Sequence, residues 1–221
     1  MKAVLKNIVA HTYKPLLERY LSKIRSYNYE NIQLEISPQV FHPGFFFSTR
    51  LLLNYIKQLP MKGKSLLEPG CGSGLISIYA AMKGASVVST DINPVAIEYL
   101  RKNSRQNQVA LTIIHSDLFK HIPAQEFDII AINPPYYRKQ PRTLKDYAWY
   151  CGENGEYFTM LFAELNNYIH PGSEVYMVLF EGCDMEMINT IAMQNQFVLQ
   201  CVHTHKNLLE ENSIFKIEKT K

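Results

Sequence analysis

From residue 64 onward, the apolar and polar positions alternate in blocks typical of strands separated by helices. Short apolar, β-branched runs predict seven strands near residues 64–68, 86–91, 111–115, 127–132, 173–180, 197–203 and 213–218. Segments with helical spacing predict helices near 74–83, 94–107, 154–169 and 184–195. The last two strands have no helix between them, so they are expected to pair antiparallel. The pattern predicts an α/β fold whose sheet is mostly parallel and ends in an antiparallel C-terminal hairpin.

The first 60 residues have a different character, and residues 1–40 are predicted to form a short N-terminal segment before a domain spanning 41–221. A helix is predicted from Pro15 to Ser26, with five apolar side chains on one face: Leu16, Leu17, Tyr20, Leu21 and Ile24. Residues 32–36 alternate like a strand, and a further helix is predicted from Arg50 to Leu59. Between them lies an aromatic segment in which His42 is interpreted as structural.

The composition of the chain limits the classes of protein to which it can belong. A chain of 221 residues with 47% hydrophobic and 19% charged residues suits one soluble catalytic domain with a short extension. No apolar stretch is long enough for a membrane span or a signal peptide, so a cytoplasmic protein is expected. The four cysteines show no paired spacing, which argues against a metal site or a disulfide framework. A net charge of +3 is compatible with RNA but too small to indicate it.

The segment from Glu68 to Gly74 predicts a glycine-rich turn between a strand and a helix. Gly70 and Gly72 tolerate positive φ and let the backbone approach a ligand that a Cβ would exclude. The N–H groups at the start of the next helix would face this ligand. In a dinucleotide-binding turn the third glycine comes one position later than Gly74, so the spacing favours S-adenosylmethionine over NAD. Cys71 is interpreted as a small filler, and an ordinary strand-to-helix turn is the alternative.

Acidic residues follow the next two strands. Asp91 ends a β-branched run about 20 positions after Gly70, where a carboxylate accepts hydrogen bonds from ribose hydroxyls. Its neighbour Ile92 is expected in the same pocket. Asn93 and Pro94 then predict the cap and first residue of a helix. Asp117 and Leu118 are the second candidate pair, with a solvated loop as the alternative.

The apolar run 127–132 is typical of a strand buried on both faces, and it ends in Asn133-Pro134-Pro135-Tyr136. Ligands bind beyond the carboxyl ends of parallel strands, so this loop is expected beside the glycine turn. The Asn133 side-chain oxygen and the Pro134 carbonyl would each accept one N–H of an NH₂ group. Pro135 fixes the backbone, and Tyr136 would stack on a planar acceptor. These four residues are predicted to be catalytic, with a structural proline turn as the alternative.

Together, the glycine turn, Asp91, Asp117 and the Asn-Pro-Pro-Tyr loop resemble the class I S-adenosylmethionine-dependent methyltransferases that methylate amide or amino nitrogens. The resemblance covers about residues 40 to 220 and implies a Rossmann-like seven-stranded sheet, S-adenosylmethionine as cofactor and a macromolecular acceptor. It assigns the adenine amino group to Asp117. Release-factor glutamine methyltransferases and small-domain ribosomal RNA methyltransferases carry a similar stretch over the cofactor, which makes Phe46, Phe47 and Thr49 candidate contacts.

The sequence defines the methyl acceptor less closely than it defines the cofactor. After the catalytic loop, basic and aromatic residues alternate, and four of them are expected to bind the acceptor: Tyr137, Arg138, Lys139 and Trp149. A lid over a peptide and a solvated basic loop are alternatives. Tyr136 at the fourth loop position occurs in protein glutamine and adenine N6 enzymes, whereas guanine N2 enzymes often carry phenylalanine. Release-factor enzymes have a larger N-terminal domain, so a protein glutamine is favoured only slightly over an RNA nucleobase. A non-catalytic scaffold subunit and a hydride-transfer enzyme are more distant alternatives.

Overall fold

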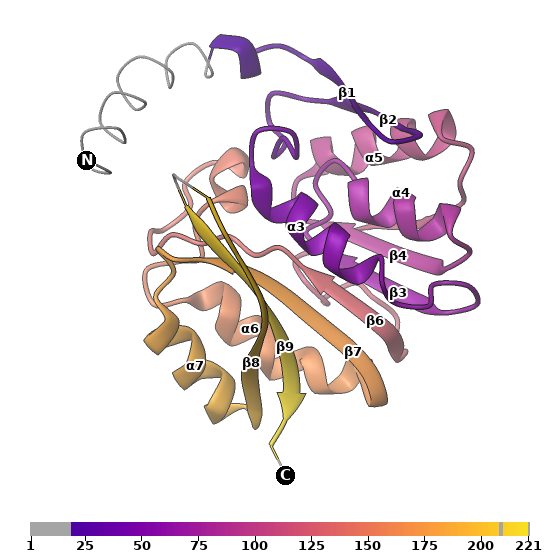
Figure 1. The fold of residues 1–221 in the computed structure, drawn as a ribbon. Coiled ribbons are helices and arrows are strands. Elements are labelled where there is room, and N and C mark those ends of the chain that lie inside the picture. The colour runs from indigo at the N-terminus through magenta and orange to yellow at the C-terminus, as the bar shows by residue number, and fades with distance from the viewer. Residues whose placement is uncertain (1–18, 208–209, 221) are drawn as a thin grey trace.

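The structure, a computed structural model, describes residues 19–207 and 210–220 and consists of a central sheet covered by helices on both faces (Figure 1). The sheet has seven strands in the order β5-β4-β3-β6-β7-β9-β8. Strands β3 to β7 run parallel, and β9 is antiparallel to both β7 and β8. The predicted fold class is therefore confirmed. The bounds are β3 (Ser65–Pro69), β4 (Ser86–Asp91), β5 (Thr112–His115), β6 (Phe127–Ile132), β7 (Ile169–Phe180), β8 (Phe197–Lys206) and β9 (Glu211–Lys219).

Helices cover the sheet in two groups. One face carries α3 (Phe47–Ile56), α4 (Leu75–Met82) and α5 (Pro94–Gln106), and the other carries α6 (Glu156–Leu165) and α7 (Met185–Gln194) (Figure 1). Successive strand residues alternate between the two cores: Leu66 faces the first group and Leu67 the second. Burial on both faces explains why the strands read as continuous apolar runs. No helix in the described part of the chain is long and apolar enough to cross a membrane.

Several predicted boundaries are wrong; strand β7, for example, begins at Ile169 and not at 173. Residues 19–21 are helical, but Arg25–Tyr29 form strand β1, which pairs antiparallel with the predicted strand, here β2 (Ile32–Ile36). The beginning of the helix predicted from Pro15 lies outside the described residues. Helix α3 begins three residues earlier than predicted, and the helix predicted over 154–169 ends at Leu165, followed by the short helix η3 (Asn166–Tyr168). In β1 every second side chain is partly buried, which is the period of a strand, and none of the five apolar residues of the predicted helical face lies in β1.

Two asparagines of α5 hold the β1–β2 hairpin against the domain. Asn107 accepts a hydrogen bond from the Gln33 N–H (2.9 Å) and donates to its carbonyl (2.7 Å), and Asn103 makes the same pair with Glu35 (2.8 and 3.1 Å). Four residues of a helix rise about 6 Å, close to the repeat of about 6.6 Å that two residues of a strand span. The buried Asn103 amide also donates to the Ser73 carbonyl (3.1 Å), which connects the hairpin to the glycine turn. The division predicted at residue 40 stays a prediction.

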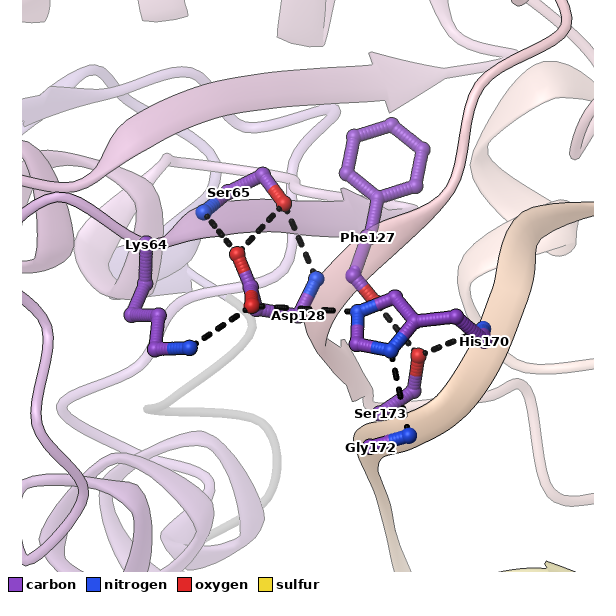
Figure 2. Close-up of polar contacts among 7 residues, drawn as sticks. All are labelled: Lys64, Ser65, Phe127, Asp128, His170, Gly172 and Ser173. Carbon is purple, nitrogen blue, oxygen red and sulfur yellow. Dashed lines mark hydrogen bonds and ion pairs between the residues drawn. The ribbon is translucent and has the colours of Figure 1, made fainter.

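A polar cluster connects the amino ends of β3, β6 and β7 (Figure 2). One Asp128 carboxylate oxygen accepts hydrogen bonds from the Ser65 N–H (2.8 Å) and hydroxyl (3.0 Å). The other accepts from the Lys64 ammonium (2.8 Å), and the His170 ring lies 3.7 Å from it. The Lys64 hydrogen bond and the Ser65 N–H lower the pKa of Asp128 well below its usual value. This cluster lies at the end of the sheet opposite the carboxyl ends of the parallel strands, so we interpret it as structural.

Candidate active site

A cavity opens beyond the carboxyl ends of β3, β4 and β6, on the line where the strand order reverses. Strand β6 pairs directly with β3, so the loop after β6 lies beside the glycine turn, as predicted. The following predicted site residues line this cavity: Thr49, Glu68, Gly70, Cys71, Gly72, Asp91, Ile92, Asp117, Leu118, Asn133, Pro134, Pro135 and Tyr136. The fold therefore brings most of the predicted cofactor and catalytic residues to one place.

The glycine turn follows the shape that its residues suggest. Gly70 and Gly72 have φ values of 71° and 51°. A Cβ at Gly70 would meet nothing within 4 Å, and one at Gly72 would meet only Val40 at 3.7 Å, so side chains there would enter the open cavity. Cys71 is buried between them, and burial raises the pKa of its thiol well above the usual value. A protonated buried thiol agrees with a filler and not with a nucleophile.

Gly74 and Phe47, both predicted to contact the cofactor, do not line the cavity. Gly74 precedes α4 with φ of 82°, and a Cβ there would lie 2.1 Å from Leu100 on α5. The left-handed backbone favours glycine here without any ligand, and a Cβ would also force the Leu100 side chain to shift. The Phe47 ring packs on His205, with the two ring centroids 4.5 Å apart. Cofactor contact by either residue stays a prediction.

Backbone N–H groups hold the Asp91 carboxylate in place. One oxygen accepts from the Gly72 N–H (2.9 Å) and the other from the Asn93 N–H (2.8 Å). Burial raises the pKa of Asp91, and these two hydrogen bonds oppose the increase. Each oxygen retains a further lone pair for a ligand hydroxyl. The predicted helix cap is confirmed, since the Asn93 side chain accepts from the Val95 N–H (3.0 Å) and Pro94 begins α5.

Glu68 is a buried acid on the cavity wall. One carboxylate oxygen accepts hydrogen bonds from the Ser77 N–H (2.9 Å) and from the Ser77 hydroxyl, which in turn is hydrogen-bonded to Ser89 (2.7 Å). The second oxygen accepts no hydrogen bond from the described residues. Burial raises the pKa of Glu68 to about 8, against the lowering effect of the Ser77 hydrogen bonds. A carboxyl with this pKa is mostly protonated at pH 7 when no ligand is bound.

The orientation of the Asn133 side chain is determined by two neighbours. Its amide nitrogen donates to the Thr49 hydroxyl oxygen (2.9 Å), and Thr49 is buried near the start of α3. Its carbonyl oxygen accepts a hydrogen bond from the Tyr136 hydroxyl. Both partners are hydroxyl groups, and together they hold the plane of the amide in place; in this orientation the carbonyl oxygen retains one further lone pair. Thr49 therefore positions Asn133, and its predicted contact with the cofactor stays a prediction.

The Tyr136 side chain is more buried than expected for a ring that stacks on an acceptor. Its side chain is 8% exposed, and its ring packs edge-on against Phe180 at 5.1 Å between ring centroids. Burial raises the pKa of Tyr136, so the hydroxyl stays protonated as a donor to Asn133. Stacking of this ring on an acceptor stays a prediction.

The four predicted acceptor-binding residues lie outside this cavity. Arg138 forms an ion pair with Asp184 at 2.7 Å, and the Lys139 ammonium lies 4.8 Å from the centre of the Tyr150 ring. Tyr137 and Trp149 line a second cavity, described below. Acceptor binding by these residues stays a prediction.

Further parts of the first cavity are lined by residues that were not among the predicted site residues, although some lie in segments that the sequence placed near the cofactor or the acceptor. They come from the segment before α3, from the short helix η2 (Leu144–Ala148) and the residues before it, and from α6: Gln39, Val40, Phe41, Gln140, Leu144, Tyr147, Glu156, Tyr157 and Met160. The Cys-Gly-Glu-Asn-Gly stretch at residues 151–155 is a sequence signal that could have indicated this part of the cavity wall. Gly152 and Gly155 both have positive φ, and they turn the chain back so that α6 begins over the cavity. The described residues contain no group of three metal-binding side chains.

The strand order and the position of the cavity define a Rossmann-like methyltransferase fold. The family model described as "Methyltransferase small domain" matches residues 31–217, so the chain belongs to this family of methyltransferases. The predicted family and enzyme class are therefore confirmed.

Relatives and solved structures agree with this assignment. The chain is 36% identical over 155 residues to a protein of Methanocaldococcus jannaschii named "Putative protein N5-glutamine methyltransferase", covering 67% of this chain and 76% of that protein. The fold is similar to the E. cuniculi Mtq2–Trm112 complex responsible for methylation of the termination factor eRF1 (TM-score 0.63, 21% identity, 82% and 99% covered). It is also similar to the T. thermophilus 16S rRNA N2 G1207 methyltransferase RsmC (TM-score 0.61, 18% identity, 90% and 50% covered).

Proposed function

We propose that the protein transfers a methyl group from S-adenosylmethionine to the side-chain amide nitrogen of a glutamine in another protein. The observation that carries this proposal is the Asn133 amide, which Thr49 and Tyr136 hold on the wall of the cavity that the glycine turn and Asp91 also line. An NH₂ group needs two acceptors to be held in a defined orientation, and the Asn133 oxygen and the Pro134 carbonyl are suited to this role.

The residues present fit the cofactor. Gly70 and Gly72 leave open space where a side chain would block a ligand, and Asp91 offers two oxygens to ribose hydroxyls. Asp117 lines the same cavity and would bind the adenine amino group, while Glu68 would face the methionine ammonium. When bound, the cofactor supplies an electrophilic methyl group on a sulfonium.

The protein's own contribution to the reaction is positioning. The nitrogen of a glutamine amide is a weak nucleophile because its lone pair is delocalised into the carbonyl. Asn133 and Pro134 would each accept one N–H and turn the nitrogen lone pair toward the methyl group. Holding reactants in such a geometry contributes roughly 7–11 kcal/mol in favourable cases. Thr49 and Tyr136 support this by fixing the Asn133 amide before the acceptor arrives.

The choice of a protein acceptor draws on the Methanocaldococcus relative, which this chain matches over three quarters of that protein's length. An RNA nucleobase, at adenine N6 or guanine N2, is the second candidate, and the fold similarity to a ribosomal RNA methyltransferase supports it. Either acceptor is a macromolecule that presents a planar NH₂ group. With either acceptor the enzyme would work in the cytoplasm, where its four free cysteines would stay reduced.

Binding of S-adenosylhomocysteine is expected to release a proton from Glu68 at neutral pH. The ligand ammonium stabilises the ionised carboxylate, whereas the unligated acid has a pKa of about 8 and is neutral. Affinity should therefore rise with pH from 6 to about 8, by up to tenfold per pH unit, and level off above that. Calorimetry in two buffers of different ionisation enthalpy measures the proton count. Glu68→Gln should release none, and a parent protein that also releases none would contradict this role.

The acceptor class is tested with labelled S-adenosylmethionine and cell extract. Incubation with the parent enzyme should label macromolecules in a form removed by protease and resistant to RNase. Mass spectrometry should then locate the methyl group on a glutamine side chain. An Asn133→Ala enzyme serves as the background control. Label removed by RNase alone would replace the glutamine proposal with the RNA one.

A further inference from the structure

A second cavity, of about 520 Å³, lies next to the first. It is formed by residues 21–25, by the segment 36–46 and by residues of the loop between Tyr137 and Tyr150. Five residues line both cavities and form a common wall: Gln39, Val40, Phe41, Ala148 and Tyr150. A ligand in the second cavity would therefore lie directly behind the wall of the catalytic one.

The charged residues of this cavity are all positive. Lys23, Arg25 and Lys145 line it, and no aspartate or glutamate does so within the described ranges. The Arg25 guanidinium lies 3.7 Å from the centre of the Tyr20 ring and donates to the Tyr20 carbonyl (2.7 Å). Lys23 and Lys145 are exposed, and neither has an ion-pair partner among the described residues. The charge of this cavity is complementary to carboxylates or phosphates.

Three aromatic rings form its apolar wall. The ring centroids of Phe41 and Phe46 are 4.4 Å apart, and Trp149 lies 5.1 Å from Phe41 and 4.7 Å from Phe46. The Trp149 ring stands edge to face with Phe46 at 74° and is tilted by 52° to Phe41. Among these three rings, no two stand parallel with a gap between them for a flat base. This wall suits a bulky apolar side chain better than nucleobase stacking.

The wall is connected to the catalytic loop through the backbone. The Trp149 carbonyl accepts hydrogen bonds from the N–H groups of Tyr136 (3.0 Å) and Tyr137 (2.8 Å). Tyr137 and Tyr150 form a parallel bridge just beyond. The chain segment that presents Asn133 is therefore held by the same residue that lines the second cavity.

We propose that the second cavity binds the segment of the acceptor polypeptide next to the methylated glutamine, with one large apolar side chain on the aromatic wall and flanking carboxylates at the lysine rim. This inference rests on the glutamine acceptor proposed above. An extended peptide advances about 3.3–3.6 Å per residue, so a few residues span from one cavity to the next. Charge complementarity at such a rim determines which partners bind and how fast they associate. The site would thus select glutamines in an acidic and apolar context.

Trp149 is the only tryptophan in the chain, so its fluorescence reports on this cavity directly. The probes are a glutamine peptide flanked by leucine and glutamates, the same peptide with lysines replacing the glutamates, and an oligouridylate, each added with S-adenosylhomocysteine present. The acidic peptide should change the fluorescence saturably and bind roughly tenfold tighter than its lysine counterpart at low salt. Lys23→Glu with Lys145→Glu should abolish or reverse this preference. Lys62→Glu, an exposed lysine before β3, is the matched control and should keep it.

The proposal would be overturned if the two peptides bind equally or if neither gives a saturable signal. A saturable response to oligouridylate alone would also overturn it. These outcomes are separate from a failure of the proposed function. If labelled extract shows methylated glutamine while the peptides do not differ, only the second cavity has been misassigned. If the label proves to be in RNA, the glutamine acceptor is wrong as well.

Discussion

Asn133→Ala is expected to lower single-turnover methyl transfer by roughly 100- to 1,000-fold, the loss typical when one preorganised polar partner of a reacting group is removed. The substitution deletes one of the two acceptors for the NH₂ group, and the nitrogen lone pair is then no longer directed at the methyl group. The glycine turn and Asp91 are untouched, so the affinity for S-adenosylhomocysteine should change only a few-fold. Rapid-quench transfer to acceptor from cell extract, together with calorimetry, measures both quantities.

Two milder variants serve as graded controls. Thr49→Val keeps the side-chain shape but removes the acceptor of the Asn133 amide N–H, and Tyr136→Phe removes the donor to its oxygen. Both should reduce transfer less than Asn133→Ala because Asn133 itself remains. Near-parent turnover in the alanine variant would refute the assignment of this loop as the catalytic centre.

Gly72→Asn should abolish the stabilisation that S-adenosylhomocysteine gives to the parent protein. At a ligand concentration of a hundred times Kd, that stabilisation is about 2.7 kcal/mol, which thermal or urea unfolding resolves readily. Asparagine tolerates the left-handed φ of 51° at this position better than other side chains, and its Cβ would meet only Val40 at 3.7 Å. The unligated fold should therefore survive while the side chain occupies the cofactor's space.

Gly74→Ala is the matched control, because it alters the third glycine of the same turn. Its Cβ would lie 2.1 Å from Leu100 at a φ of 82°, so the unligated fold itself should lose stability. The two variants thus separate a glycine needed for the ligand from one needed for helix packing. A Gly72→Asn protein that S-adenosylhomocysteine still stabilises fully would contradict the proposed cofactor site.

The domain from β3 onward was largely predictable because its signals are local. Strands buried on both faces are continuous apolar runs, and their ends carry the polar residues that meet at one edge of the sheet. For this reason Asp91, Asp117 and Asn133 could be assigned to one site from the sequence alone. The C-terminal hairpin followed from the missing helix between the last two strands.

The features that could not be predicted from the sequence depend on contacts between segments that are far apart along the chain. The turn from helix to β1 near Arg25 follows from pairing with β2 and from the asparagines of α5, far along the chain. The Tyr136 hydroxyl binds Asn133 because Phe180 and the surrounding core bury its ring, which the four-residue motif does not reveal. Likewise, the role of Gly74 follows from Leu100 in the next helix. Sequence spacing identifies the chemistry of the site more reliably than it identifies which neighbours hold each side chain.

The most direct test of the central claim is a crystal structure with S-adenosylhomocysteine bound. The ribose should meet Asp91, the adenine should lie at Asp117, and the sulfur should point toward the Asn133 oxygen. Enough room should remain between sulfur and oxygen for an acceptor nitrogen roughly 3–3.5 Å from the transferred methyl group. A ligand bound elsewhere, or a sulfur turned away from Asn133 and Pro134, would contradict the assignment of this cavity as a methyltransferase active site.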